Sequence, residues 1–535
     1  MSTMVSWVQR TAVIGAVVLV SGVVAAPGGA AVNDVGAGPE AGSATDGATP
    51  GGPATGEAAA AGEGAAADGG GDAAVTAEEV AAVVDDFRRT SRVPGVAVAV
   101  THGTGVVHAD GYGRTADGAE VTGRTTMAVA SVSKSFTALT VLQLAEEGAL
   151  DLDDPVREHL PEFAPDDPRT RDITVRQLLD QTSGLSDTGF AAFSGPQPET
   201  LRERVAQMRT AVPAAAPGER YEYHNPNYQV AARLVEVVRG EPFADVLAEH
   251  VFGPLGMADS GAADTADDLP PSARGHVRVA GIPLAAPEPP AFGGGSGGVL
   301  STAEDMAAWL IAQNNGGAAA DGARVLSEEG IAASHTPSDA GSYALGWDTG
   351  TTASGAPLVE HGGDLFTSTA YQALLPASGY GVAVMVNTAS GPDAHALGAL
   401  LVDLVDGADV PAPPSPWGGA AVDAALLVAA AGSAAAAGLG VRRAAGWARR
   451  RAGRPWWAAV RSLPLAAPAV LFGSVHLVMG ALYRGRDVAW IQMAYLAPAF
   501  MLLLGVAALS GAAVLAARTA AVTRLRRTSR RTAEG

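Results

Sequence analysis

One stretch of the sequence decides the fold, Ala130-Ser131-Val132-Ser133-Lys134-Ser135-Phe136. Lys134 is the single lysine in a chain with 35 basic residues, and all the others are arginine. Arginine keeps its proton at any accessible pH, whereas a buried lysine can release it, so this one amine can act as a base. Ser131 and Lys134 are three residues apart, which on a helix places both side chains on one face.

The residues after this stretch predict a helix beginning near Ser131. Phe136, Leu139, Leu142 and Leu144 have the spacing of its apolar side. A serine at the start of a helix, with a lysine beside it on the same face, is the arrangement of an activated nucleophile. The alternative is an N-cap serine followed by a solvated lysine, and this stretch alone does not decide between them.

Composition and charge exclude several functions. The chain has 535 residues, no cysteine and a net charge of −20, so disulfides and thiolate metal sites are excluded. Residues 411–535 hold 15 of the 35 basic and three of the 55 acidic residues, which leaves 20 basic and 52 acidic residues before them. We expect so acidic a body not to bind nucleic acid. No histidines have H-E-x-x-H spacing, so we expect no metal site and no cofactor.

The N-terminal part is predicted to lie outside the folded domain. Residues 1–31 have the features of a secretory signal peptide, namely Arg10, an apolar run and small residues at its end. An uncleaved membrane anchor is the alternative. Residues 32–76 consist mainly of Gly, Ala, Pro and Thr without apolar periodicity, which predicts a disordered linker.

Residues 77–407 have the pattern of an α+β domain. Residues 77–89 have helical spacing, and residues 96–108 contain two β-branched strands around a turn. Further helical patterns come next, one of them with a capping box predicted at Ser301 and Glu304, and strand-like runs return at residues 370–375 and 381–387. Helices in the middle with strands at both ends predict a sheet that joins both ends of the domain.

The C-terminal part is predicted to cross a membrane. After a Pro-rich spacer at residues 408–419, residues 420–517 contain three apolar segments of about 20 residues or more, the length needed to span a bilayer. Arginine clusters lie between the first two segments and in the basic tail, residues 518–535. Both clusters fall on one side if all three segments span, which satisfies the positive-inside rule. We therefore expect a multi-pass protein of the cell membrane with an extracytoplasmic domain and a cytoplasmic tail; the alternative is an Ala-rich soluble bundle.

Three short motifs occur in order along the domain. Ser131-Val132-Ser133-Lys134 is followed after 92 residues by Tyr223-His224-Asn225 and after another 138 by His361-Gly362-Gly363. This set resembles the serine β-lactamase and penicillin-binding-protein superfamily, in particular its class C β-lactamase, D-alanyl-D-alanine carboxypeptidase and esterase branch. The resemblance covers about residues 77–407. It implies a β-lactamase/transpeptidase-like fold, an antiparallel sheet flanked by helices.

The resemblance also implies roles for the motif residues. Ser131 would attack a carbonyl carbon and become acylated, with Lys134 and Tyr223 working as a pair that takes its proton. The sequence leaves open which of the two is the base. Asn225 would donate a hydrogen bond to the substrate or to Lys134. Read without the resemblance, Tyr223 is rather a packed aromatic residue in a Tyr-rich turn, and the alternative for Asn225 is a turn residue before proline.

The third motif is expected to bind the substrate. The backbone N–H of Ser131 would be one oxyanion donor, and by resemblance that of Asp364 would be the other. Gly362 and Gly363 would let a substrate lie along the strand edge. His361 stands where many relatives have lysine; because histidine is mostly neutral at pH 7, it predicts a weaker demand for an anionic substrate. Asp364 replaces a glycine found in many relatives, which changes the expected pocket shape.

Together these observations predict a membrane-anchored serine hydrolase. Its substrate would be a small molecule or peptide containing an ester, a D-amino peptide bond or a β-lactam amide. We expect an esterase or D-alanyl peptidase rather than an efficient β-lactamase, with cell-wall material as a partner if the chain is bacterial. The alternative is a catalytically idle sensor of β-lactams or cell-wall fragments that signals through the membrane segments.

Overall fold

The computed structural model describes residues 74–389, 391–451, 453, 455–482 and 485–534. The predicted signal peptide, residues 1–31, lies outside the described residues. So does the predicted linker, residues 32–76, except for its last three residues.

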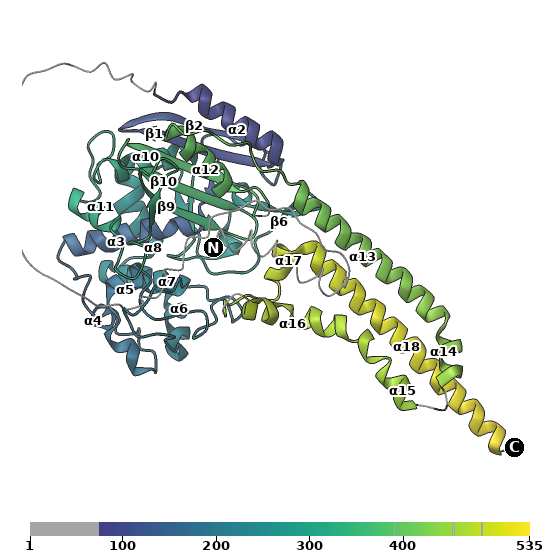
Figure 1. Cartoon of the computed structure of the whole chain (residues 1–535). Coiled ribbons are helices and arrows are strands. Elements are labelled where there is room, and N and C mark those ends of the chain that lie inside the picture. Colours follow the sequence, from purple (N-terminus) through teal and green to yellow (C-terminus); the bar gives the residue numbers. More distant parts are fainter. Residues whose placement is uncertain (1–73, 390, 452, 454, 483–484, 535) are drawn as a thin grey trace, which may run out of the picture. The chain divides into compact units, whose positions relative to one another are not determined.

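The main sheet has six antiparallel strands in the order β2-β1-β11-β10-β9-β8. Its strands come from both ends of the domain, because β1 pairs with β11 from Val96 opposite Val386 to His102 opposite Tyr380. The predicted α+β domain, with an antiparallel sheet flanked by helices, is therefore confirmed (Figure 1). The strands are β1 (Gly95–His102), β2 (Gly105–Gly113), β8 (Asp348–Thr351), β9 (Pro357–Asp364), β10 (Thr369–Leu375) and β11 (Tyr380–Val386).

Alternating residues of β1 enter two different hydrophobic cores, as the period of a strand requires. Val96 and Val98 pack with helices α2 and α12 on one face of the sheet. Ala97 and Ala99 pack with α3 and α10 on the other face. The four helices are α2 (Ala77–Ser91), α3 (Ser133–Glu146), α10 (Ala303–Asn314) and α12 (Ala394–Val405).

The remaining helices of the domain lie mostly between α3 and α10 in the chain. They are α4 (Val156–His159), α5 (Val175–Leu179), α6 (Leu201–Gln207), α7 (Asn225–Arg239), α8 (Phe243–Leu247), α9 (Gly253–Leu255) and, after α10, α11 (Glu328–Ser334). Two small antiparallel sheets complete the domain. One has the order β3-β7-β4 and the other is the hairpin β5-β6, with bounds β3 (Met127–Ala128), β4 (Gly261–Ala262), β5 (Gly275–Val279), β6 (Ile282–Ala286) and β7 (Val299–Ser301).

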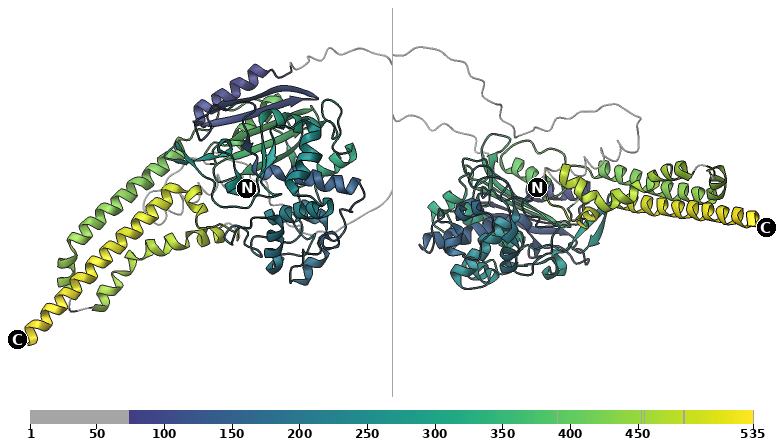
Figure 2. Two further views of the ribbon diagram at one scale, coloured as in Figure 1. Left: turned by 180° about the vertical axis from the view of Figure 1, so that it is seen from behind. Right: turned by 90° about the horizontal axis from the view of Figure 1, so that it is seen from below.

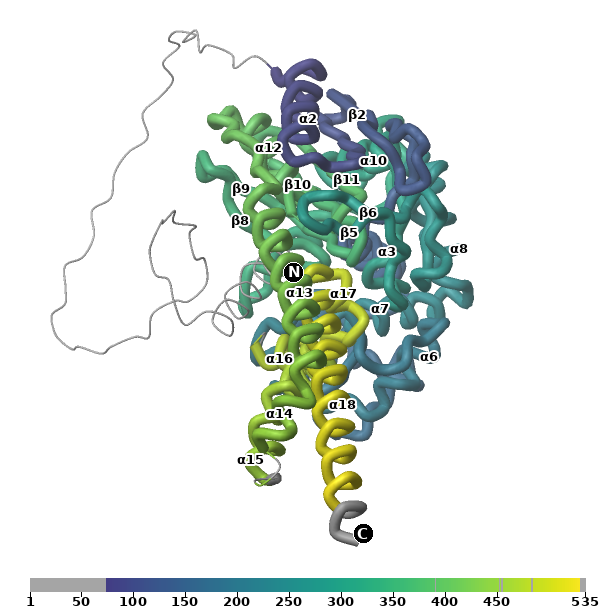
Figure 3. The backbone as a smooth tube through the Cα atoms, turned by 90° about the vertical axis from the view of Figure 1, so that its right-hand side faces the viewer, coloured from purple at the N-terminus to yellow at the C-terminus, as the bar shows by residue number. Residues whose placement is uncertain are grey.

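Six helices come after the domain. They are α13 (Trp417–Arg442), α14 (Ala444–Arg451), α15 (Pro455–Val460), α16 (Ala467–Leu482), α17 (Gln492–Leu496) and α18 (Pro498–Glu534). Helices α13 and α16 both pack along α18 (Figures 2 and 3).

Among the described residues, two helices are long and apolar enough to cross a membrane, Trp417–Arg442 and Pro498–Ser529. The pair Trp456–Leu465 and Ala467–Leu482 would be a third span, bent by 44°. The last of the three predicted apolar segments covers roughly residues 492–517. In the structure this range is not one helix, because α17 ends before Ala497 and α18 begins at Pro498. Proline lacks a backbone N–H and disfavours helical geometry in the residue before it. The spanning of a membrane itself stays a prediction.

Candidate active site

Ser131 lies in a single 3₁₀ turn, η1 (Ala130–Val132), between β3 and α3. The helix predicted to begin near Ser131 becomes a regular α-helix at Ser133, directly after this turn, and Ala130 at the start of the turn has a φ of +50°. The left-handed region costs a non-glycine residue on the order of 1–2 kcal/mol. Such strain is typical of functional sites. The turn leaves Ser131 7% exposed and lining a pocket.

Lys134 lies one turn further along, and it is completely buried. Its Nζ is 3.1 Å from Oγ of Ser131 and 2.7 Å from the carbonyl oxygen of Ser296. The sequence spacing thus brings amine and hydroxyl within hydrogen-bond distance. Burial, together with the nearby charge of Arg486, holds the pKa of Lys134 well below its usual value of 10.5.

Tyr223 approaches the same two residues from the segment before α7. Its ring centroid lies 4.8 Å from Nζ of Lys134. The residue as a whole is half-buried, but its hydroxyl end is enclosed beside Ser131. This burial raises the pKa of Tyr223 above its ordinary value, and a hydrogen bond with Ser131 offsets only part of the rise. A phenol in this environment keeps its proton at neutral pH.

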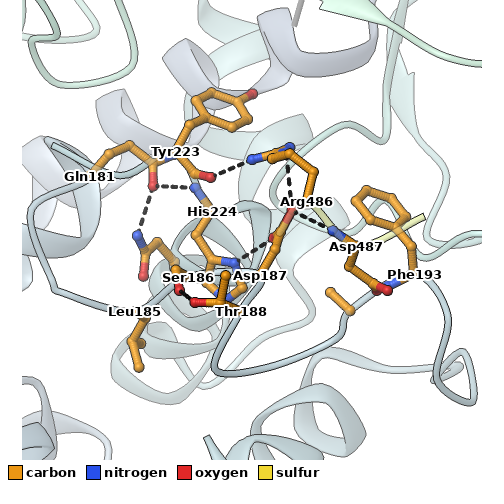
Figure 4. Close-up of polar contacts among 12 residues, drawn as sticks. Gln181, Leu185, Ser186, Asp187, Thr188, Phe193, Tyr223, His224, Arg486 and Asp487 are labelled. Carbon is orange, nitrogen blue, oxygen red and sulfur yellow. Dashed lines mark hydrogen bonds and ion pairs between the residues drawn. The ribbon is translucent and has the colours of Figure 1, made fainter. Parts of the chain in front are cut away.

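The segment around Tyr223 is held by buried polar contacts (Figure 4). Oε1 of Gln181 accepts hydrogen bonds from the backbone N–H of His224 (3.1 Å) and from Nδ2 of Asn227 (2.7 Å). Gln181 itself has a φ of +63°. Nδ1 of the fully buried His224 lies 2.9 Å from Oδ1 of Asp187. These contacts fix the backbone that carries the tyrosine.

Asn225 lines the pocket with Ser131. Its Oδ1 is buried and has no hydrogen-bond partner among the described residues. A buried polar atom without a partner costs about 1–3 kcal/mol, so it is expected to be satisfied by a bound group. Asn225 thus lines the pocket, and no hydrogen bond joins it to Lys134 in the described structure.

His361, on β9, is buried and 3% exposed. Nε2 lies 3.0 Å from the hydroxyl of Tyr343, and Nδ1 lies 2.7 Å from the carbonyl oxygen of Gly362. Burial and the charge of Lys134 lower the pKa of His361 to about 3. The imidazole is therefore neutral at physiological pH and supplies no cation to the site.

The two glycines after His361 allow close approaches on opposite sides of β9. A Cβ on Gly362 would lie 2.1 Å from the ring of His395, and one on Gly363 would lie 2.4 Å from the carbonyl oxygen of Val129. Gly363 therefore requires glycine, because its neighbour is backbone, whereas a side chain at Gly362 would displace the ring of His395. Gly363 brings the strand directly beside the turn that carries Ser131.

The end of β9 has a free edge beside the pocket. Strand β8 pairs with β9 only as far as Glu360, whereas β10 pairs with β9 up to Asp364. Residues 361–364 therefore have no strand partner on the β8 side among the described residues. Oδ1 of Asp364 lies 3.2 Å from Nε2 of His395, which directs this carboxylate away from Ser131 and into an ion pair.

The pocket at Ser131 is mostly apolar and opens to solvent. Its cavity volume is about 100 Å³. Phe292, Leu365 and Phe366 belong to the α+β domain, and Val488, Tyr495 and Leu496 belong to the segment between helices α16 and α18.

Of the four acidic residues that line the pocket, Asp264 and Glu288 have raised pKa values. Burial raises the pKa of Glu288 to about 7, although hydrogen bonds from the N–H of Phe366 and from Thr367 oppose this rise. Burial, together with nearby acidic residues, raises the pKa of Asp264 to about 6. Both groups therefore change charge near neutral pH.

Sequence reasoning missed Ser296, Asp187 and Arg486. Ser296 lies in the Gly-rich run 293–298, whose pattern suggests only a phosphate loop that lacks its lysine. Arg486 and Asp487 stand in a short charged loop between two apolar segments, on the predicted outer side of the membrane. A basic residue there goes against the positive-inside rule, and this was the available signal.

No predicted site residue has metal-ligand geometry in the described structure. Among the described residues, Glu241, Glu249 and His250 have ligand atoms within 4.8 Å of one another. None of the three lines the pocket at Ser131.

Comparison with known proteins supports the family suggested by the motifs. The family model described as Beta-lactamase matches residues 80–406. Penicillin-binding protein 4 of Amycolatopsis lactamdurans is 31% identical over 325 residues, which are 57% of this chain and 83% of that protein. Protein flp of Staphylococcus aureus (strain MW2) is 26% identical over 315 residues, which are 58% of this chain but only 63% of that relative's length.

A solved structure supports the fold. The octameric penicillin-binding protein homologue from Pyrococcus abyssi matches with a TM-score of 0.53 and 26% identity, over 62% of this chain and 78% of that chain. The predicted β-lactamase/transpeptidase-like fold is therefore confirmed.

Proposed function

Because the chain belongs to the β-lactamase family of serine hydrolases, we propose that it cleaves an ester or amide bond through an acyl-enzyme formed on Ser131. One observation carries this proposal: Nζ of the fully buried Lys134 lies 3.1 Å from Oγ of Ser131. Burial disfavours the charged form of lysine. A neutral amine at this distance is what general-base activation of a hydroxyl requires.

In the proposed reaction, Oγ of Ser131 bonds to the carbonyl carbon and its proton passes to Nζ of Lys134. The oxyanion is held by the backbone N–H groups of Ser131 and Asp364. When the intermediate collapses, Tyr223 protonates the leaving group and regains a proton from Lys134. Water then attacks the acyl carbon, which frees Ser131 and releases the acid. The raised pKa of Tyr223 supports its role as proton donor rather than base.

Two features favour neutral ester and peptide substrates over β-lactams. His361 is uncharged, so it offers no cation for a substrate carboxylate. Asn225 lines the pocket, and its unpartnered Oδ1 can accept a hydrogen bond from a substrate N–H. An ester or a D-amino peptide is therefore the proposed substrate, and cell-wall peptides are the natural source in a bacterial cell. The name of the Amycolatopsis relative keeps β-lactams among the compounds to test.

The proposed location is the outer side of the cell membrane. Two long apolar helices and one bent pair support a membrane anchor. The arginine clusters at residues 442–454 and 518–531 support a cytoplasmic position for the far ends of these helices. Because the chain has no cysteine, Ser415→Cys and Ser529→Cys variants can test this topology with a membrane-impermeant maleimide. In intact cells we expect labelling at position 415 and none at position 529; the reverse pattern would refute the orientation.

A sensor is the second candidate function. One observation favours it: Arg486, in the loop between the membrane helices, touches the backbone of Tyr223 in the active site. Acylation could in this way be communicated to the membrane helices. The two candidates differ in the lifetime of the adduct, since an enzyme turns over and a sensor stays acylated.

The test of the proposed function is acylation of the full chain in lipid nanodiscs. We expect p-nitrophenyl acetate and fluorescent penicillin to add an acyl group at Ser131, located by mass spectrometry, and the Ser131→Ala variant to remain unmodified. Release of p-nitrophenol beyond one equivalent identifies an enzyme, whereas a stable adduct identifies a sensor. Acylation elsewhere, with Ser131 unmodified, would refute both candidates.

A further inference from the structure

The segment between helices α16 and α18 reaches the active site. It comprises residues 485–496, which include helix α17 and lie in a part of the sequence with none of the family motifs. Several of its residues line the pocket together with Ser131. Its position is therefore relevant to which substrates fit.

Arg486 attaches this segment to the backbone of the catalytic domain (Figure 4). Its guanidinium donates to the carbonyl oxygen of Tyr223 at 2.8 Å and lies 3.1 Å from Oδ2 of Asp187. The side chain of Asp187 is only 4% exposed. Burial alone would raise the pKa of this carboxyl, but His224 and Arg486 together hold it below its ordinary value. A buried carboxylate with two such partners is a strong anchor.

Asp487 makes a second attachment. Its Oδ2 accepts hydrogen bonds from the backbone N–H groups of Phe193 (2.5 Å) and Ser194 (2.8 Å). Its own N–H donates to Asp187 at 3.3 Å. Arg486 and Asp487 thus attach residues 485–496 to the loop before α6 and to the backbone just before α7. The start of α17 is positioned as a consequence.

The anchored segment presents apolar side chains to the pocket. Val488, Tyr495 and Leu496 line it, and the Tyr495 ring lies edge-on to that of Phe366 with centroids 6.3 Å apart. Phe292 of the catalytic domain lines the pocket as well. These side chains enclose space that water occupies unfavourably and that an apolar group would fill.

We infer that residues 485–496 form one wall of an apolar subsite for the acyl part of the substrate. This segment then selects substrates with an apolar acyl group. This inference rests on the proposed function. The pocket is lined by Ser131 but by neither Lys134 nor Tyr223. Because Tyr223 protonates the leaving group in the proposed reaction, the leaving group lies on the tyrosine side and the acyl group lies in this pocket.

The experiment measures kcat/KM of the full chain in nanodiscs on p-nitrophenyl acetate, butyrate and hexanoate. Each buried methylene contributes ~0.8 kcal/mol, or about fourfold in kcat/KM. We expect a rise of roughly that size per methylene in the unaltered chain. In Val488→Ser and Leu496→Ser variants the rise is expected to fall below about twofold per methylene, because a hydroxyl replaces the apolar side chain in the wall of the subsite.

The matched control is Leu482→Ser, which alters a 57% exposed leucine at the end of α16 outside the pocket. It corrects for partitioning of the longer esters into lipid, and we expect it to keep the full chain-length preference. Arg486→Gln should lose the preference because the segment is released, whereas Arg486→Lys should restore part of it. A merely structural arginine would lower all three rates equally.

The outcomes separate the two proposals. If acetate acylates Ser131 but chain-length preference is absent, or survives in Val488→Ser and Leu496→Ser, the subsite inference is wrong and the proposed function stands. If no ester acylates Ser131, the proposed function fails and the subsite inference fails with it.

Discussion

Gly363 lies so close to Ser131 that a Cβ on it would come 3.0 Å from the Ser131 nitrogen. The same Cβ would be 2.4 Å from the carbonyl oxygen of Val129, a distance that real Cβ atoms do not show. Strand β9 therefore touches the backbone of the nucleophile turn without any side chain between them. The proposed oxyanion donor on Asp364 depends on this contact.

Gly363→Ala is expected to remove most activity. The methyl group must push β9 away from residues 129–131, which separates the two proposed oxyanion donors. A displacement of about 1 Å can cost on the order of 100-fold in rate. The measurement is the rate of Ser131 acylation by p-nitrophenyl acetate. Gly350→Ala is the matched control, because a Cβ at this glycine of β8 meets nothing within 4 Å. Equal rates in both variants would contradict the proposal that the end of β9 supplies an oxyanion donor.

Lys134→Arg is expected to slow acylation strongly, because it replaces an amine that can be neutral by a group that stays charged. A guanidinium cannot release its proton at an accessible pH, so Ser131 would have no base. Loss of a general base lowers the rate by about 100-fold to 10,000-fold. In the unaltered chain, the acylation rate should rise with pH as Lys134 loses its proton, and level off well below pH 10.5. Undiminished hydrolysis by the variant, with an unchanged unfolding temperature, would disprove the role of the amine.

Tyr223→Phe is expected to affect substrates according to their leaving groups. p-Nitrophenolate leaves without a proton, so hydrolysis of the activated ester should change by less than about tenfold. An alkyl ester or an amide needs the proton that Tyr223 donates, and its rate should fall by about 100-fold or more. The comparison of kcat/KM on the two substrate types is the measurement. An equal loss on both would mean that Tyr223 acts before the leaving-group step.

Glu288→Gln is expected to remove a pH dependence of substrate selection. Because the pKa of Glu288 is raised to about 7, its carboxyl is charged above that pH and neutral below it. Esters that carry a carboxylate should therefore gain relative to neutral esters as the pH falls from 8 to 5, by roughly threefold to tenfold. His361 cannot cause this change, since its pKa is about 3.

The ratio of kcat/KM for the two esters, measured across this pH range, tests the role of Glu288. The variant should lose most of the change, with the remainder due to Asp264, whose pKa is about 6. Glu304→Gln, at an exposed position outside the pocket, is the control. An unchanged pH profile in Glu288→Gln would show that the carboxyl does not face the substrate.

Local pattern predicted much of the fold. The first helix, the first hairpin and the spacing of Ser131 and Lys134 depend on periodicity, which residues close in sequence determine. The order of the three motifs predicted which side chains would meet, and the structure brings Ser131, Lys134 and Tyr223 together. One capping prediction was off by a residue: Thr302, with Asp305, caps α10 in place of the predicted Ser301 and Glu304.

Contacts between distant parts of the chain could not be predicted. Arg486 reaches Tyr223 across 263 residues of sequence, and Lys134 reaches Ser296 across 162. No periodicity encodes such pairs, because each depends on how whole elements pack. The left-handed φ of Ala130 was equally hidden, because alanine does not favour this backbone conformation and the residue type gives no sign of it.

The attachment of Arg486 and Asp487 has a practical consequence for work with truncated protein. A soluble fragment ending in the Pro-rich spacer would keep every motif residue yet lack the residues that close the pocket beside Leu365 and Phe366. Compounds screened against that fragment would be fitted to a wider opening than the intact molecule offers. Inhibitor discovery therefore calls for the complete chain, with detergent or lipid treated as an assay variable.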